Sequence, residues 1–423
     1  MRRSLAIVVT FALGFTACDT PEDENYLWLL SLPNAGTGEG TEDLPVHVEV
    51  DDVAGDPDFL FDSTRDIQVF INVIDPRAPV AGSRVTIYEL DENGNPVNTI
   101  SFRAVTNENG NVGGTLTIDR TTNLVELAVT YQDAVHRMLI DVRFVQEIRR
   151  TLNILALRQP ILVADRDSDG VPDQDDSFPD DPDRATTVYC PADGSAYTVA
   201  YEDLYPNRGD ADFNDYVLRV RYELDLNAQG EVARIRGHYQ HIARGAAYRH
   251  TLHLTLPGVS NAHLDWTRFD AAGQLLSQGN SEIADFTAIE MMPDSSTTIE
   301  QSNTSKTGQF RPGQALSFEV TLGAPILRSQ LGPLPFDLFI HVLNTGHDVH
   351  FLGRYANVDG SDRFLDSAGF PWALMVPQNW RWPYEKENIH NGYGFFKDWY
   401  ESRGTASADW FSKPDDRYVV PAF

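Results

Sequence analysis

The fold is decided by a stretch that reads Asp215-Tyr216-Val217-Leu218-Arg219-Val220-Arg221-Tyr222-Glu223-Leu224-Asp225-Leu226. Every even position from Leu218 to Leu226 is apolar, and every odd position from Arg219 to Asp225 is charged. Successive side chains of a β-strand point to opposite faces of a sheet, so a period of two predicts one buried and one solvated face. This stretch therefore predicts an antiparallel β-sheet that is wet on one side.

The same period recurs along the rest of the chain. It is seen at Leu252, Leu254 and Leu256, at Leu316, Phe318, Val320 and Leu322, and at Phe336, Leu338, Ile340 and Val342. Only the tail, from about Tyr384 to Arg403, is compatible with a helix, which would bury one aromatic stripe made of Phe395, Phe396, Trp399 and Tyr400. We interpret these aromatic side chains as packing rather than as a carbohydrate-stacking platform. Residues 185–423 are thus expected to form a large β domain with a short C-terminal helix.

A smaller β domain is expected over residues 46–157. Ile67, Val69 and Ile71 alternate with polar residues, and the runs 91–95 and 107–111 are rich in Asn, Gly and acidic residues, as turns are. Residues 79–88, followed by Thr106-Asn107-Glu108-Asn109-Gly110, resemble the carboxypeptidase-regulatory or prealbumin-like β-sandwich modules. That resemblance implies a spacer or adhesion support without catalysis. The fold class predicted for the chain is all-β, with two sandwich-like domains.

The segment that joins these domains, residues 158–184, contains Asp165-Arg166-Asp167-Ser168-Asp169-Gly170-Val171-Pro172-Asp173-Gln174-Asp175-Asp176. It has oxygen ligands at alternate positions, a glycine that permits a sharp turn, and a carboxylate in the twelfth place, which is the layout of a calcium loop. The stretch resembles the thrombospondin type 3 calcium repeat. The resemblance assigns Asp165, Asp167, Asp169 and Asp176 to one calcium ion, with Asp173 as a further candidate, and extends less clearly to Asp180, Asp181 and Asp183. The alternative is a solvated acidic linker that binds cations weakly and non-specifically.

A second acidic stretch lies between Tyr201 and Asp215. Its side chains would converge on one cation if the turn folds back, which Pro206 and Gly209 allow; they are Glu202, Asp203, Asp210, Asp212, Asn214 and Asp215. The alternative is that Asp212 and Asn214 only bond the backbone of the turn, as Asx residues usually do. Metal binding and turn chemistry both remain open at this point.

This second acidic stretch also carries a resemblance to a known family. Together with residues 217–222, 371–377, 382–386 and 409–411, it resembles the LruC-type domain of exported bacterial lipoproteins. The resemblance covers nearly all of residues 185–423. It implies a location in the cell envelope, and the family has no established activity from which to carry over a mechanism.

The amino terminus has the layout of a bacterial export signal. Arg2 and Arg3 precede an apolar stretch from Leu5 to Phe15, too short to span a bilayer, and Ala17-Cys18 follows. We predict a signal peptide over residues 1–17, a lipid anchor on Cys18 and an acidic tether over residues 18–45. The alternatives are an ordinary signal peptide with a coincidental cysteine, or a membrane anchor. The only other cysteine is Cys190, so no disulfide framework is expected.

Composition narrows the classes of function. The 33 basic and 62 acidic residues give a formal net charge of −29, which argues against electrostatic capture of nucleic acid and favours cations as partners. No common hydrolase, zinc-protease or nucleotide-binding pattern occurs, so we expect no enzyme. The sequence favours a calcium-binding lipoprotein of the outer membrane or cell surface, with an adhesion or envelope-interaction role towards an extracellular protein or glycan. The alternatives are a glycan-binding or glycan-processing envelope protein, and a structural envelope component that uses calcium only as a staple.

Overall fold

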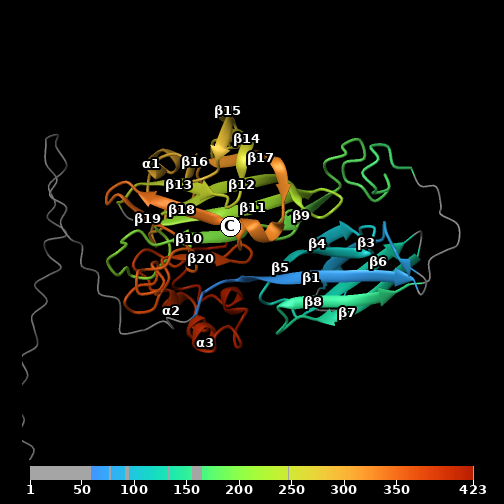
Figure 1. Cartoon of the computed structure of the whole chain (residues 1–423). Helices are drawn as coiled ribbons and strands as arrows, with labels where there is room; N and C mark the ends of the chain where they lie inside the picture. Colours follow the sequence, from blue (N-terminus) through green and yellow to red (C-terminus); the bar gives the residue numbers. More distant parts are fainter. Residues whose placement is uncertain are drawn as a thin grey trace, which may run out of the picture. The chain divides into compact units, whose positions relative to one another are not determined.

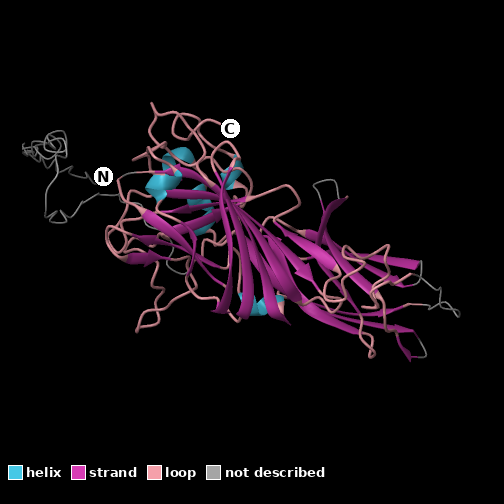
Figure 2. Cartoon of the chain, turned by 90° about the horizontal axis from the view of Figure 1, so that it is seen from above, coloured by secondary structure: helices cyan, strands magenta, loops and turns pink. Residues whose placement is uncertain are grey.

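A computed structural model describes residues 59–75, 78–90, 95–131, 134–154, 164–245 and 247–422, within a compact unit that spans His47–Phe423. The predicted signal peptide, Cys18 and the tether lie outside the described residues. Strands dominate the described part and helices are few and short, which confirms the all-β prediction (Figures 1 and 2). Among the described residues, no helix is long and apolar enough to cross a membrane.

The N-terminal strands form two four-stranded sheets (Figure 1). One contains β2 (Ala78–Pro79), β1 (Thr64–Asp75), β5 (Asn111–Asp119) and β8 (Glu147–Asn153), and the other contains β4 (Pro96–Val105), β3 (Arg84–Leu90), β6 (Leu124–Tyr131) and β7 (Ala134–Asp141). Strand β1 pairs antiparallel with β5 and parallel with β8. The alternating Ile67, Val69 and Ile71 are buried, as the period of two predicts, and pack in one hydrophobic cluster with Val85 and Ile87 of the other sheet.

The larger part of the chain forms one eight-stranded and one four-stranded sheet. The first runs in the order β15 (Leu275–Asp285), β14 (Ser260–Phe269), β17 (Ala315–Ile326), β12 (Val232–Arg244), β11 (Tyr216–Leu226), β10 (Tyr197–Tyr201) and β20 (Ala373–Val376), with β9 (Thr186–Cys190) also paired to β11. The second runs in the order β16 (Ile289–Met292), β13 (His250–Thr255), β18 (Asp337–Val342) and β19 (His347–Val349). A short helix, α1 (Ser295–Thr298), follows β16.

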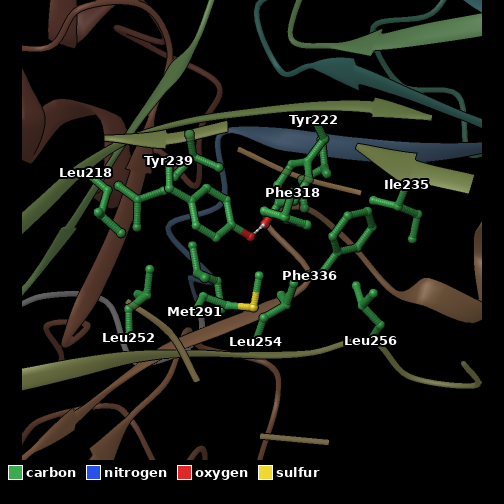
Figure 3. Close-up of a cluster of buried hydrophobic side chains, with 14 of the residues drawn as sticks. Leu218, Tyr222, Ile235, Tyr239, Leu252, Leu254, Leu256, Met291, Phe318 and Phe336 are labelled. Atoms are coloured by element: carbon green, nitrogen blue, oxygen red, sulfur yellow. Dashed lines mark hydrogen bonds between the residues drawn. The ribbon is translucent and has the colours of Figure 1, made fainter. Parts of the chain in front are cut away.

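Strand β11, which contains the stretch quoted first, supplies the core between these sheets through its even positions. Leu218 and Tyr222 pack with side chains of β13 and β17 (Figure 3). The hydroxyls of Tyr222 and Tyr239 are hydrogen-bonded at 2.6 Å, and Tyr222 also donates to the carbonyl of Pro335 at 2.9 Å. Because each buried hydroxyl has a partner, the two tyrosines can lie in an apolar core.

The charged face of β11 is only partly wet, which corrects the expectation from the alternation. Asp225 is fully buried, and it accepts hydrogen bonds from Arg234 Nε at 2.6 Å and from Arg236 Nη2 at 2.6 Å. Thr187 Oγ1 on the neighbouring β9 donates to the same carboxylate at 2.7 Å. The alternating pattern locates the two faces of a strand, and what covers each face depends on neighbours that are distant in sequence.

The C-terminal segment forms a second aromatic core beside the eight-stranded sheet. Instead of one helix over 384–403, it has two short ones, α2 (Ile389–Gly392) and α3 (Phe396–Glu401). Phe396, Trp399 and Tyr400 are buried as expected, whereas Phe395, at 46% exposure, is not part of the stripe.

Two aromatic residues from the other end of the described chain complete this core. The Phe59 ring lies 4.8 Å from the Trp399 ring, and the Phe61 ring lies 5.8 Å from the Phe396 ring. Phe59 and Phe61 fall within the range expected for the small sandwich, 46–157, yet their side chains pack in the core of the C-terminal segment.

Two candidate cation sites

The aspartate-rich segment, which we call the linker loop (residues 164–184), is held to its surroundings at several points. Val171 is buried with Ala185 and Ala228, against Val105 of the small sandwich. Asp175 forms an ion pair with Arg84, and its carbonyl accepts a hydrogen bond from Arg103 Nη1 at 3.3 Å. Side chains of β3 and β4 therefore contact the loop directly, which differs from an extended, freely solvated linker.

Within the loop, carboxylate oxygens of Asp165, Asp167 and Asp169 lie within 4.8 Å of one another. The turn that gathers them passes through Gly170, whose φ of +94° lies in a region that other residues rarely adopt. The backbone N–H groups of Ser168 and Gly170 donate to the two oxygens of Asp165 at 2.8 and 3.2 Å. The predicted calcium layout thus brings three of its carboxylates together.

Three carboxylate oxygens of the linker loop are buried without a hydrogen-bond partner in the described part of the chain. They are Oδ2 of Asp167, Asp169 and Asp176. Burial raises the pKa of Asp169 to about 6, and the negative charges of Asp176, Asp167 and Asp165 add to the rise. Burial likewise raises the pKa of Asp176, again with nearby aspartates contributing. A divalent cation bound among these side chains would offset both the cost of burying their negative charges and the repulsion between them.

Three further aspartates of the loop have basic partners. Both oxygens of Asp173 are bonded to Arg166, through its backbone N–H at 2.9 Å and its Nε at 3.1 Å. Asp180 pairs with the same arginine at 3.0 Å, and Asp181 pairs with Arg184. The structure therefore favours Asp165, Asp167, Asp169 and Asp176 as ligands over Asp173.

The second group, which we call the buried cluster, consists of Glu202, Asp210 and Asp212, each with a carboxylate oxygen within 4.8 Å of the others. Glu202 directly follows β10 and is 3% exposed, and Asp212 is 2% exposed. The residues on either side of Asp212, Ala211 and Phe213, have φ values of +55° and +50° and are buried in the second aromatic core.

Each carboxylate in the buried cluster has only part of its bonding capacity used by the protein. Glu202 Oε1 accepts a hydrogen bond from the Phe213 N–H at 2.5 Å, and its Oε2 is buried with no hydrogen-bond partner among the described residues. Asp212 accepts from the N–H groups of Asn214 at 3.2 Å and of Lys386 at 2.8 Å. The bond to Asn214 is the turn chemistry that formed the alternative hypothesis, so turn bonding and convergence of carboxylates occur at the same residue.

Burial is also the main cause of the shifted pKa values here. It raises the pKa of Glu202 and of Asp212 well above their ordinary values, and that of Asp210 to about 6. After burial, the negative charge of Glu385 raises the pKa of Asp210 most. Glu385 was not among the candidate residues, because it is far away in sequence and its surroundings contain no acidic run. Its only signal was its place in the Trp382–Lys386 segment, which belonged to the family resemblance.

The remaining candidates from this stretch are buried nearby and serve other contacts. Asp203 Oδ2 lies 2.9 Å from His250 Nε2, and Asp215 Oδ2 accepts the Asp203 N–H at 3.0 Å. Asn214 Nδ2 donates to the carbonyl of Pro383 at 3.2 Å. Asp203 and Asp215 are not part of the convergent group of three carboxylates. Asn214 Oδ1 is buried without a hydrogen-bond partner among the described residues.

Histidine and cysteine do not add to these clusters. In the described ranges, groups of three or more such potential metal ligands are found only at the linker loop and the buried cluster. His350 pairs with Asp337 at 2.7 Å and His341 with Asp348 at 2.6 Å, so each of these histidines has a carboxylate partner. Burial raises the pKa of the Cys190 thiol to about 12, so the thiolate required for reactivity is disfavoured.

Comparisons with known proteins extend this description. Residues 230–411 match the family model described as a domain of unknown function (DUF4842), within the range that resembles the LruC-type domain. The chain has no match among curated proteins. The crystal structure of a candidate lipoprotein from Bacteroides ovatus is similar with a TM-score of 0.50 and 14% identity, covering 80% of this chain and 99% of that one.

Two further solved structures show much weaker similarity. The major pilin subunit of Bacillus cereus matches with 6% identity over 74% of this chain and 68% of that chain, and a carbohydrate-binding module of the β-sandwich superfamily matches with 11% identity over 62% and 92%. Both TM-scores are 0.14, too low to indicate a shared fold. The chain is therefore similar in fold to a candidate bacterial lipoprotein, and part of its larger domain matches DUF4842.

Proposed function

We propose that this protein is a lipid-anchored component of the bacterial cell envelope whose linker loop binds calcium, and that it serves adhesion or envelope interactions without catalysis. The observation that carries the proposal is the set of three buried, unpartnered oxygens on Asp167, Asp169 and Asp176. They lie in a loop with calcium-loop spacing that contacts both the small sandwich and the larger β domain.

The physical case for calcium rests on the donor set. Calcium accepts six to eight oxygen ligands in flexible geometry, and the loop offers carboxylates and backbone carbonyls without nitrogen or sulfur donors. An ion bound there would fix the conformation of the linker loop, and the loop would then act as a rigid spacer between the two β domains. With a dissociation constant of about 10⁻⁴ M, typical of extracellular modules, about 1 mM calcium would stabilise the folded protein by about 1.4 kcal/mol.

The anchor and the location are supported by two independent features. The first is the export-signal layout that ends at Cys18. The second is the similarity in fold to a candidate lipoprotein, which covers 80% of this chain. A lipid on Cys18 would hold the folded part at a membrane surface through the tether of residues 18–45.

Thermal unfolding of the purified protein with calcium and with chelator tests the calcium site. We expect a calcium-dependent rise in stability that Asp169→Ala and Asp176→Ala each abolish for the linker loop. An equal unfolding curve with and without calcium would contradict the proposal.

Membrane fractionation of Cys18→Ser tests the anchor. We expect the variant to be released from membranes that retain the wild-type protein, and retention of the variant would contradict lipidation. Turnover of a polysaccharide by the purified protein would contradict the non-catalytic role and favour the glycan-directed alternative.

A further inference from the structure

We infer that Glu202, Asp210 and Asp212 form a second and separate site in the buried cluster for a hard divalent cation such as calcium, with Glu385 as a neighbouring charge. The site lies in the larger β domain and shares no residue with the linker loop. It does not depend on the linker loop binding calcium, on the lipid anchor or on an external ligand.

The first step of the argument is the convergence of charge in a buried place. Three carboxylates approach within 4.8 Å of one another although two of them, on Glu202 and Asp212, are almost entirely inaccessible to water. The negative charge of Glu385 bears on both Asp210 and Asp212. Buried carboxylates that face one another without a counter-ion are strongly unfavourable, because each adds repulsion to the cost of leaving water.

The second step is an oxygen that the protein leaves unused. Glu202 Oε2 has no hydrogen-bond partner in the described structure, and only 3% of the Glu202 surface is exposed to water. This oxygen packs directly against the backbone of Gly209, where a Cβ atom would collide with it. The φ of Gly209 is not in the left-handed region, so the glycine is required by space rather than by backbone conformation. The absence of a side chain at Gly209 therefore leaves space for Glu202 Oε2, an acceptor with no hydrogen-bond donor in the described structure.

The third step is the choice of ligand. The three converging side chains and the neighbouring Glu385 offer only carboxylate oxygens, which suit a hard cation such as calcium. Lys386 lowers the pKa of Asp210, and its side chain is exposed. An exposed ammonium group compensates a buried carboxylate only weakly, whereas a divalent ion among Glu202, Asp210 and Asp212 would compensate most of their charge.

The fourth step is what such an ion would hold together. The Lys386 N–H donates to Asp212, and the Ile389 N–H donates to the carbonyl of Ala211 at 2.8 Å. The Glu385 N–H donates to the carbonyl of Thr304 at 3.1 Å. Three segments distant in sequence therefore meet at the buried cluster: residues 202–212, Thr304 and residues 385–389. A cation in the cluster, attracted also by the charge of Glu385, would fasten the C-terminal aromatic core to strand β10.

The test is a count of calcium ions bound per chain, measured by native mass spectrometry on the full-length protein and on single variants. Glu202→Gln keeps the shape of the side chain and its acceptor for the Phe213 N–H, and removes the charge. We expect it to lose one ion, with at least a tenfold weaker site in Glu385→Gln. Glu387→Gln, two residues further along the same segment, is the matched control and should bind as the wild type does.

Terbium luminescence gives a second readout. Trp372 lies next to Gly209, with its Cζ3 atom 3.8 Å from where a Gly209 Cβ would be, so it can sensitise Tb³⁺ bound in the buried cluster. We expect Glu202→Gln to remove most of the tryptophan-sensitised emission and Asp169→Asn to leave it intact. If Glu202→Gln does not fold, the half-buried Glu385 gives the decisive variant.

Each outcome separates this site from the linker loop. Loss of an ion in Glu202→Gln with no loss in Glu387→Gln supports the inference, whatever the linker variants show. Retention of every ion and of the emission in Glu202→Gln and Glu385→Gln would overturn it. Loss of an ion only in Asp169→Asn would overturn it as well and leave the linker site of the proposed function in place.

Discussion

The linker loop and the buried cluster gather the same kind of side chain in different surroundings. In both, three carboxylates lie within 4.8 Å of one another. In the linker loop, Asp165, Asp167 and Asp169 are all half-buried, whereas Glu202 and Asp212 are 3% and 2% exposed. In the linker loop only single oxygens, such as Oδ2 of Asp167 and Asp169, are shielded from water, whereas in the buried cluster the whole side chains of Glu202 and Asp212 are. The comparison teaches that spacing identifies possible ligands, and that burial decides how much the fold depends on an ion.

The largest effect is expected from Gly209→Ala in the buried cluster. The new Cβ would collide with Glu202 Oε2 and displace it from the cation site. We expect a loss of about 3 kcal/mol in calcium-saturated stability, from overpacking together with a weakened ion. Chemical denaturation with and without calcium measures it.

Gly394→Ala is the matched control, because an added Cβ meets open space there and the φ of Gly394 lies outside the left-handed region. Equal losses in the two variants would show that the close fit of Gly209 to Glu202 has no special role.

A smaller effect, on pH dependence, is expected from Asp119→Asn in the small sandwich. Asp119 is a half-buried acid outside the two convergent groups; it accepts a hydrogen bond from the Tyr197 hydroxyl at 2.9 Å. Burial, and then the charge of Glu89, raises its pKa from 3.8 to about 7. Between these values the folded protein keeps a proton that the unfolded chain releases, so wild-type stability falls as pH rises.

Asp119→Asn should therefore be more stable than the wild type by about 2 kcal/mol near pH 8, and the gain should shrink towards about pH 4. Denaturation across this range measures it. Calcium should leave the difference unchanged, and a calcium-dependent difference would contradict the distinction between single buried acids and convergent clusters.

A still smaller effect, confined to calcium, is expected from Asp169→Asn in the linker loop. It should lose about 1.4 kcal/mol of stabilisation at about 1 mM calcium and lose none with chelator, because without the ion the substitution removes a charge that burial and the neighbouring aspartates disfavour. Thermal unfolding of the variant and of the wild type measures both values. A loss in chelator as large as that in calcium would place Asp169 in a purely structural role.

The smallest effect is expected from Asp173→Asn. Both oxygens of Asp173 are bonded to Arg166, so it should contribute little to ion binding although the spacing made it a candidate. Calcium titration calorimetry should give an affinity within about threefold of the wild type, a difference of about 0.65 kcal/mol. A tenfold weaker affinity would restore Asp173 as a ligand.

The sequence alone was sufficient for the all-β class and for the location of both acidic groups. The period of two in β11 reflects a property of the strand itself, and the aspartate spacing of the linker loop reflects a local turn at Gly170. Both signals lie within a dozen consecutive residues, which is why they can be recognised without the fold.

Contacts between distant segments could not be predicted from the sequence. Glu385 bears on Asp210 from a position 175 residues away, and Phe59 and Phe61 pack against α3 at the other end of the described chain. Asp225 is buried by two arginines on a neighbouring strand, although its alternating position predicted a wet face. In each case the register and packing of the sheets decide which side chains meet, and no local pattern encodes that.

The most direct test of two independent cation sites is the number of calcium ions bound per chain in the wild type, in Asp169→Asn, in Glu202→Gln and in the double variant. Native mass spectrometry at a fixed free calcium concentration gives the counts. We predict two ions in the wild type, one in each single variant and none in the double variant. Loss of both ions from either single substitution, or no ion in the wild type, would contradict two separate sites.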